Sequence, residues 1–388
     1  MQQNPLRRLN ALGHSVWLDY IRRDLVAGPE LGRLIRQDSL AGMTTNPTIF
    51  HKAIAESQLY DADISLYGRR GLGAVEIYDR LVLRDVGMAA DALLGVWEKT
   101  GGNDGFVSLE VSPHLAYDTK GTAAEAKRLF NLIARPNVMI KIPATEQGLD
   151  AIRESLFHGI HVNVTLLFGV SRYKEVISWY LDALDNRLGA KYASRQIRSV
   201  ASFFVSRVDT AVDARLDAVQ KDSRFTPAQR ELARSLVHRT AIANARVAWG
   251  AYKEGFAGPI FERIAQQSGA KQRPLWASTS TKNPALSDLY YVEALVGPES
   301  VDTMPPATLD AYRDHGKPAV RIDEDPEGAL RVVSQLLSLG IDLDRVALEL
   351  EADGVRKFVA SYDDLIAAIE SKRRHLVALP VSGVSPGV

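Results

Sequence analysis

The sequence predicts an α/β fold, a (β/α)₈ TIM barrel of parallel strands with additional C-terminal helices. Short apolar runs alternate with longer amphipathic runs from the start of the chain to about residue 320, and this alternation indicates a parallel sheet. The short runs are apolar at successive positions, as is typical of strands covered on both faces. Eight such strand–helix units suit a closed barrel, whose usual size is about 250 residues plus insertions.

The predicted elements follow one another in a regular order. The strands are expected at residues 15–20, 42–46, 105–112, 138–143, 161–168, 200–208, 275–280 and 300–304. The helices are expected at residues 29–37, 71–99, 120–134, 148–157, 170–187, in two segments within 210–268, and at 287–296 and 306–315. A doubly wound open sheet is the alternative, but no Gly-x-Gly-x-x-Gly turn follows the first strand.

Three regions are expected along the chain. Residues 1–320 should form the catalytic barrel, and residues 321–376 should form a helical extension that packs on it, with its clearest helices at 327–337 and 354–374. These helices could cap one mouth of the barrel. Residues 377–388 are expected to be a flexible tail, because the stretch from Pro380 to Val388 is rich in Pro, Gly, Ser and Val.

The composition excludes several functional classes. Basic and acidic residues both number 47, so the net charge is zero, and neither nucleic acid nor an anionic membrane is expected as a partner. No apolar run approaches the roughly 20 residues that cross a bilayer, and the N-terminus has no signal-like apolar segment. The chain has no cysteine, which excludes disulfides and thiolate sites and fits a cytoplasmic location. We expect a monomer or a homodimer.

Neither a metal nor another cofactor is expected. His158 and His161 lie close in sequence but not at the spacing of metal ligands, and there is no His-Glu-x-x-His. Walker-type and Gly-x-Ser-x-Gly motifs are also absent. The candidate chemistry therefore depends on polar residues that the predicted strands carry toward their C-terminal ends, where barrel enzymes place their sites.

Lys141 stands alone in the apolar run Val138-Met139-Ile140-Lys141-Ile142-Pro143. Burial disfavours a charged ammonium group, and a neutral amine attacks carbonyls to form an imine. A lysine paired with a carboxylate at the barrel mouth is an equally good interpretation of the position alone. Asp19 on the first strand and Glu110 on the third could supply that partner, or could move the protons that imine chemistry requires.

Further polar residues follow the other strands. Amides and hydroxyls inside a barrel suit a polyhydroxylated ligand, although they could also fill the barrel by bonding to one another. Cations and a hydroxyl group near the sixth and seventh strands would suit a phosphate. The candidates are Thr45, Asn46, Asn163, Thr165, Ser202 and Phe204 for the ligand body, and Arg207, Ser278 and Lys282 for the phosphate.

Together these segments resemble the transaldolase family. The matching segments, in family order, are 17–20 (WLDY), 42–47 (GMTTNP), 108–111 (SLEV), 138–145 (VMIKIPAT), 161–168 (HVNVTLLF), 202–209 (SFFVSRVD) and 275–283 (LWASTSTKN). The last of them is similar to the longer bacterial subgroup. The resemblance implies a (β/α)₈ barrel in the non-oxidative pentose phosphate pathway. Such an enzyme transfers a dihydroxyacetone unit between sugar phosphates, with no cofactor or metal.

The resemblance also implies a role for each candidate. Lys141 would form the Schiff base, Glu110 would relay protons through a water held by Thr165, and Asp19 would take the proton of the C4 hydroxyl group. The substrate-binding residues would be Thr45, Asn46, Asn163, Ser202 and Phe204, with the phosphate held by Arg207, Ser278 and Lys282. Lys282 departs from the shorter members of the family, which have an arginine there; a lysine offers a point charge and not a planar fork.

Two alternative functions stay open at this stage. One is a Schiff-base aldolase that releases free dihydroxyacetone or acts on deoxyribose phosphate. The other is a non-catalytic phosphosugar-binding barrel, which would have no need of Lys141, Asp19 and Glu110 together.

Overall fold

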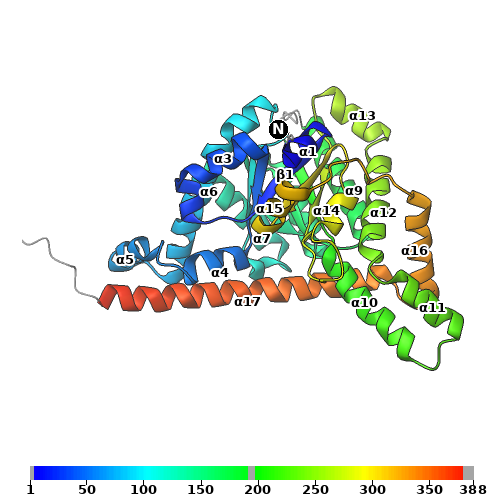
Figure 1. The fold of residues 1–388 in the computed structure, drawn as a ribbon. Coiled ribbons are helices and arrows are strands. Elements are labelled where there is room, and N and C mark those ends of the chain that lie inside the picture. Colours follow the sequence, from blue (N-terminus) through cyan, green and yellow to red (C-terminus); the bar gives the residue numbers. More distant parts are fainter. Residues whose placement is uncertain (1–3, 191–196, 379–388) are drawn as a thin grey trace, which may run out of the picture.

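A computed structural model describes residues 4–190 and 197–378 of the chain. Its centre is a closed barrel in which each strand is parallel to the next and the eighth pairs with the first (Figure 1). The strands are β1 His14–Asp19, β2 Leu40–Thr44, β3 Phe106–Glu110, β4 Val138–Pro143, β5 Val162–Leu167, β6 Ser199–Phe204, β7 Arg273–Ala277 and β8 Ser300–Met304. The predicted TIM barrel is confirmed.

Helices surround this barrel and extend beyond it. Those up to the sixth strand are α1 Pro5–Ala11, α2 Arg23–Ala27, α3 Pro29–Asp38, α4 Pro47–Ala55, α5 Asp61–Arg69, α6 Ala74–Lys99, η1 Pro113–Leu115, α7 Thr119–Ile133, α8 Glu146–Phe157 and α9 Val170–Gly189. The remainder are α10 Ser206–Lys221, α11 Pro227–Leu236, α12 Thr240–Gly255, α13 Pro259–Gln266, α14 Tyr290–Ala294, α15 Pro306–His315, α16 Pro326–Ser338 and α17 Leu343–Ala378.

The N-terminal end of the barrel is closed by a polar plug. Arg273 of β7 donates hydrogen bonds to Asp104 at 2.8 Å and to the Ser15 hydroxyl group at 2.9 Å. Trp17 of β1 donates its indole N–H to the same aspartate at 3.0 Å. This network uses the polar groups at the lower end, so the open polar side chains lie at the C-terminal ends of the strands, as in other barrels of this kind.

The C-terminal helix α17 crosses the other end of the barrel. It runs along the lower edge of Figure 1, coloured orange to red, and contacts α4, α5, α6, α10, η1 and β5. A Cβ atom on Gly354 of α17 would lie 2.8 Å from the Leu166 side chain of β5, so glycine allows the helix to approach the strand end closely. Lys372 then ties the end of α17 to α5 through Asp61 at 2.8 Å.

Several predicted boundaries were wrong. Helices α1, α2, α4 and α5 were not predicted, and the two segments expected within 210–268 are parts of four helices, α10 to α13. The sixth strand ends at Phe204 and not at residue 208, because β7, its partner, ends at Ala277 opposite Phe204. Helix α17 continues to Ala378, and the predicted tail segment from Pro380 to Val388 lies outside the described residues.

Candidate active site

Lys141 lies inside the barrel, near the C-terminal end of β4. Its side chain is only 6% exposed, and in the register of the sheet it is flanked by Glu110 of β3 and Asn163 of β5. The Lys141 amine donates a hydrogen bond to the backbone carbonyl of Thr45 at 2.9 Å. It also lies 3.6 Å from Oε2 of Glu110. The amine is therefore held in one position between β2 and β3.

Glu110 can hold a proton near neutral pH. Burial raises the pKa of its carboxyl group to about 7, and the positive charge of Lys141 opposes this shift. Its Oε2 atom is buried and has no hydrogen-bond partner within the described part of the chain. A carboxyl group with this pKa can both give and take a proton at neutral pH, which is the requirement for general acid–base catalysis.

Asp19, at the end of β1, is the second carboxyl group of the site. The Thr44 hydroxyl group donates to it at 2.7 Å, and the same hydroxyl lies 2.6 Å from that of Thr303 on β8. Burial raises the pKa of Asp19, and the charge of Lys141 opposes the increase. The two threonines thus fix the orientation of this carboxylate, while Lys141 couples it electrostatically to the rest of the site.

A chain of amide and hydroxyl groups crosses the barrel next to Lys141. Ser202 of β6 donates to the Asn163 side-chain carbonyl at 2.6 Å, and the Asn163 amide donates to the Ser108 hydroxyl group of β3 at 3.0 Å. Thr165 is fully buried, and its hydroxyl group has no partner within residues 4–190 and 197–378. An orphaned buried hydroxyl of this kind usually bonds to water.

Arg207 does not lie on a strand. It was expected at the end of the sixth strand but occupies the first turn of α10, which begins at Ser206. The valines on either side of it, Val205 and Val208, give the segment an apolar, strand-like appearance that local pattern alone does not resolve. The guanidinium group lies over the ring of Phe204, 5.1 Å from its centroid. Its positive charge partly opposes the rise in the pKa of Asp19 that burial causes.

Ser278 lies beside the start of α10. Its hydroxyl group is 3.0 Å from that of Ser206, and the Ser206 backbone N–H donates to its carbonyl. Ser278 is held with a positive φ of 56°, so the chain turns sharply here after β7. Lys282 is exposed in the loop that follows, and within the described residues its ammonium group makes no ion pair. The structure therefore places Ser278 beside Ser206, at the start of the helix that carries Arg207.

Thr45 and Asn46 follow β2 and do not belong to it, contrary to the predicted strand end. The Thr45 hydroxyl group donates to the Ser108 carbonyl at 2.8 Å and is fully buried, so its backbone carbonyl is the group that faces Lys141. Asn46 is the N-cap of α4, and its side-chain carbonyl accepts the Ile49 N–H at 3.0 Å. Its amide N–H groups are left for other partners.

A buried amine beside two protonatable carboxyl groups is an arrangement suited to imine formation. The sequence profile described as Transaldolase/Fructose-6-phosphate aldolase matches residues 16–369, which is nearly the whole chain. The chain belongs to the transaldolase/fructose-6-phosphate aldolase family.

Individual members of this family match the chain over almost its full length. It is 46% identical to the transaldolase of Frankia alni over 367 residues, covering 94% of this chain and 96% of that protein. It is 42% identical to the transaldolase of Thiobacillus denitrificans over 366 residues, covering 94% and 99%. It is 45% identical to transaldolase 1 of Streptomyces coelicolor over 367 residues, covering 94% and 93%.

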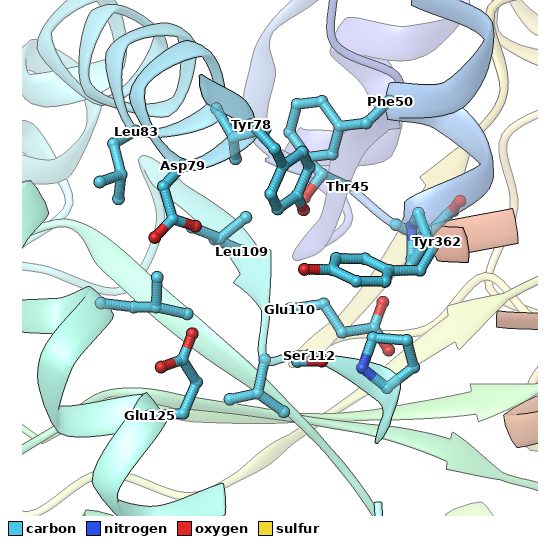
Figure 2. Close-up of a pocket in the computed structure, with 16 residues that line it drawn as sticks. Thr45, Phe50, Tyr78, Asp79, Leu83, Leu109, Glu110, Ser112, Glu125 and Tyr362 are labelled. Carbon is cyan, nitrogen blue, oxygen red and sulfur yellow. The ribbon is translucent and has the colours of Figure 1, made fainter. Parts of the chain in front are cut away.

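The structure adds residues that motif reasoning had not singled out. Thr44 and Ser108 lie inside the matching segments, but their hydrogen bonds with Asp19 and Asn163 are formed only in the closed barrel. Tyr362 of α17 lines a cavity beside Glu110 (Figure 2), and no local pattern of α17 points to it. Within the described ranges no three His, Asp or Glu side chains are grouped as metal ligands, and no helix is long and apolar enough to cross a membrane.

Proposed function

We propose that the protein is a transaldolase that moves a dihydroxyacetone unit from a ketose phosphate to an aldose phosphate through an imine on Lys141. The observation that carries the proposal is the buried Lys141 amine 3.6 Å from the Glu110 carboxyl group. Curated relatives that share 41–46% of their residues with the chain are named transaldolases, which supports the same reaction.

The first half-reaction begins at the C2 carbonyl of the ketose. The Lys141 amine adds to this carbon. The oxygen then receives one proton from the amine nitrogen and one from Glu110, and it leaves as water while the iminium group forms. Thr165, whose hydroxyl group has no protein partner in the described part of the chain, is placed in this proposal to hold that water. Asp19 then takes the proton of the C4 hydroxyl group as the C3–C4 bond breaks, and the electron pair moves into the iminium group to give an enamine.

The second half-reaction reverses these steps on another aldehyde. The enamine attacks the carbonyl carbon of the acceptor, Asp19 returns a proton to the new hydroxyl group, and water hydrolyses the imine. Fructose 6-phosphate with erythrose 4-phosphate would give sedoheptulose 7-phosphate and glyceraldehyde 3-phosphate, reversibly. The iminium group accepts the electron pair, so the proposed steps use neither a metal nor another cofactor.

The remaining candidate residues bind the substrate in this proposal. Asn46, Asn163 and Ser202 hold hydroxyl groups of the dihydroxyacetone unit, and Thr45 holds Lys141 through its backbone carbonyl. Phe204 covers the imine and limits attack by water. Arg207 and Ser278 bind the phosphate from the start of α10 and the turn after β7, with Lys282 reaching it from the exposed loop.

A Schiff-base aldolase that releases free dihydroxyacetone is the second candidate, because the matching family includes fructose-6-phosphate aldolases by name. The two functions separate when the aldose acceptor is left out. A transaldolase then stops after one turnover with the enamine retained. Continued turnover on fructose 6-phosphate alone would instead support the aldolase.

The decisive test of imine chemistry is reduction with borohydride in the presence of fructose 6-phosphate. We expect a covalent adduct on Lys141, identified by mass spectrometry of peptides, and none in the Lys141→Met variant. The absence of an adduct, or an adduct on a different lysine, would refute the mechanism.

We also propose that the protein acts in the non-oxidative pentose phosphate pathway of the cytoplasm, as a monomer or homodimer. The absence of cysteine supports a reducing compartment. Light scattering on the purified protein measures the oligomeric state, and a tetramer or larger assembly would contradict this part of the proposal.

A further inference from the structure

A small cavity lies beside Glu110 (Figure 2). Its walls come from β3, the start of α4, the helices α6 and α7, and α17. The ionisable side chains that line it are those of Tyr78, Asp79, Glu110, Glu125 and Tyr362. The cavity volume is about 20 Å³, which is room for one or two water molecules and far below the several hundred Å³ of a metabolite site.

Two tyrosine hydroxyl groups meet in the centre of this cavity. Figure 2 shows Tyr78 of α6 and Tyr362 of α17 with their hydroxyl groups directed into it, and their rings make an edge-to-face contact with centroids 5.4 Å apart. Tyr362 also packs edge-on against His114 at 5.8 Å. Burial raises the pKa of Tyr78 and raises that of Tyr362 to about 12. Both hydroxyl groups therefore keep their protons and can donate to water.

The outer wall of the cavity reaches solvent. Asp79 of α6 and Glu125 of α7 are joined by Arg128, which lies 2.9 Å from the first and 2.7 Å from the second. The side chains of these two acids are 24% and 21% exposed. Protons can therefore exchange between bulk water and the two carboxylates at this end.

The inner wall of the cavity includes Glu110, whose buried Oε2 lies 3.6 Å from the Lys141 amine and has no hydrogen-bond partner in the described residues. Figure 2 shows its side chain next to the Tyr362 ring. Buried polar atoms without a protein partner are usually satisfied by ordered water. The alternative path to solvent, through the barrel mouth, is crossed by α17 and would be filled by the substrate during turnover.

We propose that Tyr362 and Tyr78 are positioning residues that hold water in this cavity, and that this water connects Glu110 to solvent for proton exchange. The inference rests on the proposed function. Iminium formation from a ketone and a neutral amine consumes one proton and releases one water molecule, whereas hydrolysis takes up one water molecule and releases the proton. Glu110 therefore gives up a proton when the imine forms and regains one when the imine is hydrolysed, and the cavity water lets this carboxyl group exchange protons with solvent by a route that a bound sugar phosphate does not block.

Other charged groups also act on Glu110, and the test has to leave them unchanged. They are Lys141 of β4, Asp19 of β1 and Arg207 of α10. Replacing either tyrosine by phenylalanine removes only one hydroxyl group and keeps the ring contacts. A change in proton transfer can then be assigned to the cavity water and not to a lost charge.

The experiment compares the full-length Tyr362→Phe and Tyr78→Phe proteins with the wild type. Tyr173→Phe is the matched control, because it removes another buried tyrosine hydroxyl group that has no partner in the described residues. Imine formation with fructose 6-phosphate is followed by rapid quenching with borohydride across a pH range of about 5.5–9, in H₂O and in D₂O. The release of glyceraldehyde 3-phosphate is measured in the same single-turnover samples.

We expect the two cavity variants to form the imine about 10-fold more slowly, with a larger solvent isotope effect and a shifted pH profile. This is a fraction of the roughly 10²–10⁴-fold that general acid catalysis contributes. C3–C4 cleavage from the imine and the melting temperature should stay close to those of the control. Unchanged imine formation in both variants would overturn the inference, as would equal slowing of imine formation and cleavage. A wild type without an adduct on Lys141 would instead refute the proposed function itself.

Discussion

The Lys141 amine lies 3.6 Å from Oε2 of Glu110, and each of the two side chains is 6% exposed. The two groups share one buried environment on neighbouring strands, so the charge of each depends on the protonation of the other. Removing one member of a buried pair leaves the other uncompensated. This relationship makes proton transfer at Glu110 the first property of the site to test.

Glu110→Gln should slow imine formation by about 100-fold, the low end of what general acid catalysis contributes. The pKa of Glu110 is raised to about 7, so the protonated, acid form is lost as the pH rises through 7. In the wild type this loss should reduce imine formation above pH 7; in the variant the reduction should be absent. Borohydride trapping at a series of pH values measures both effects, and a variant with the wild-type profile would exclude Glu110 as the acid.

Asp19→Ala should abolish C3–C4 cleavage while imine trapping persists. The reason is that Asp19 acts on the C4 hydroxyl group in the proposed mechanism, after the imine has formed. The measurement is the ratio of trapped adduct to released glyceraldehyde 3-phosphate, with Thr303→Val as a control that removes only a contact to Thr44, the hydrogen-bond donor to Asp19. Loss of trapping in the alanine variant would make Asp19 a structural partner of Lys141.

Arg207→Ala should raise KM for fructose 6-phosphate by about 30-fold, because a hydrogen bond to a charged group contributes about 1.5–3 kcal/mol. Lys282→Ala should raise it only about 3-fold, since an exposed charge is screened by solvent. Steady-state kinetics with fructose 6-phosphate and with unphosphorylated fructose separates phosphate binding from other effects. If the KM of the lysine variant rises as much as that of the arginine variant, the loop after β7 must close onto the phosphate.

Asp302→Asn should make stability less dependent on pH. The Asp302 carboxyl group on β8 is fully buried and accepts the Thr279 hydroxyl group at 2.8 Å, and burial raises its pKa to about 8. The folded protein keeps this proton between about pH 4 and 8 whereas the unfolded chain releases it. Each pH unit in that window therefore costs the wild type up to about 1.4 kcal/mol.

Asparagine has no proton to lose, and its side-chain carbonyl can still accept from Thr279. The stability of the variant relative to the wild type should consequently increase from about pH 5 to about pH 8 in urea unfolding. Asp150→Asn, at an exposed position, is the control and should show no such trend. A constant difference between variant and wild type at the two pH values would mean that Asp302 is not the titrating group.

Much of the barrel could be predicted because its signals are local. Every predicted strand overlaps one in the structure, since buried parallel strands are continuous apolar runs between amphipathic helices. The errors occurred where two local signals conflict. Val205 and Val208 continue an apolar run past the point at which β7 stops pairing. The pair Asn46-Pro47 was interpreted as the end of a strand, but a proline after an asparagine is also typical of a helix start, and these two residues begin α4.

Residue type and position also predicted which amine and carboxyl groups the barrel brings together. A lysine in an apolar strand and carboxylates on nearby strands are visible in the sequence, and the closed barrel places Glu110 and Lys141 opposite each other in register. By contrast, the position of Ser278 beside the start of α10 depends on an unusual backbone conformation at φ 56°. Such a conformation is set by the surrounding packing and leaves no mark in residue type, because serine is not specialised for it.

The sequence by itself determined the family, the alternation of strands and helices, and the identity of the amine and the two carboxyl groups, because these depend on residue type and on spacing along the chain. Only the tertiary structure decided that Tyr362, far from Glu110 in sequence, lies beside it across a small cavity. It also decided that Arg273 closes the opposite end of the barrel. These relationships join distant segments through barrel closure and through the path of α17, and no periodicity within one segment encodes where another segment will pack.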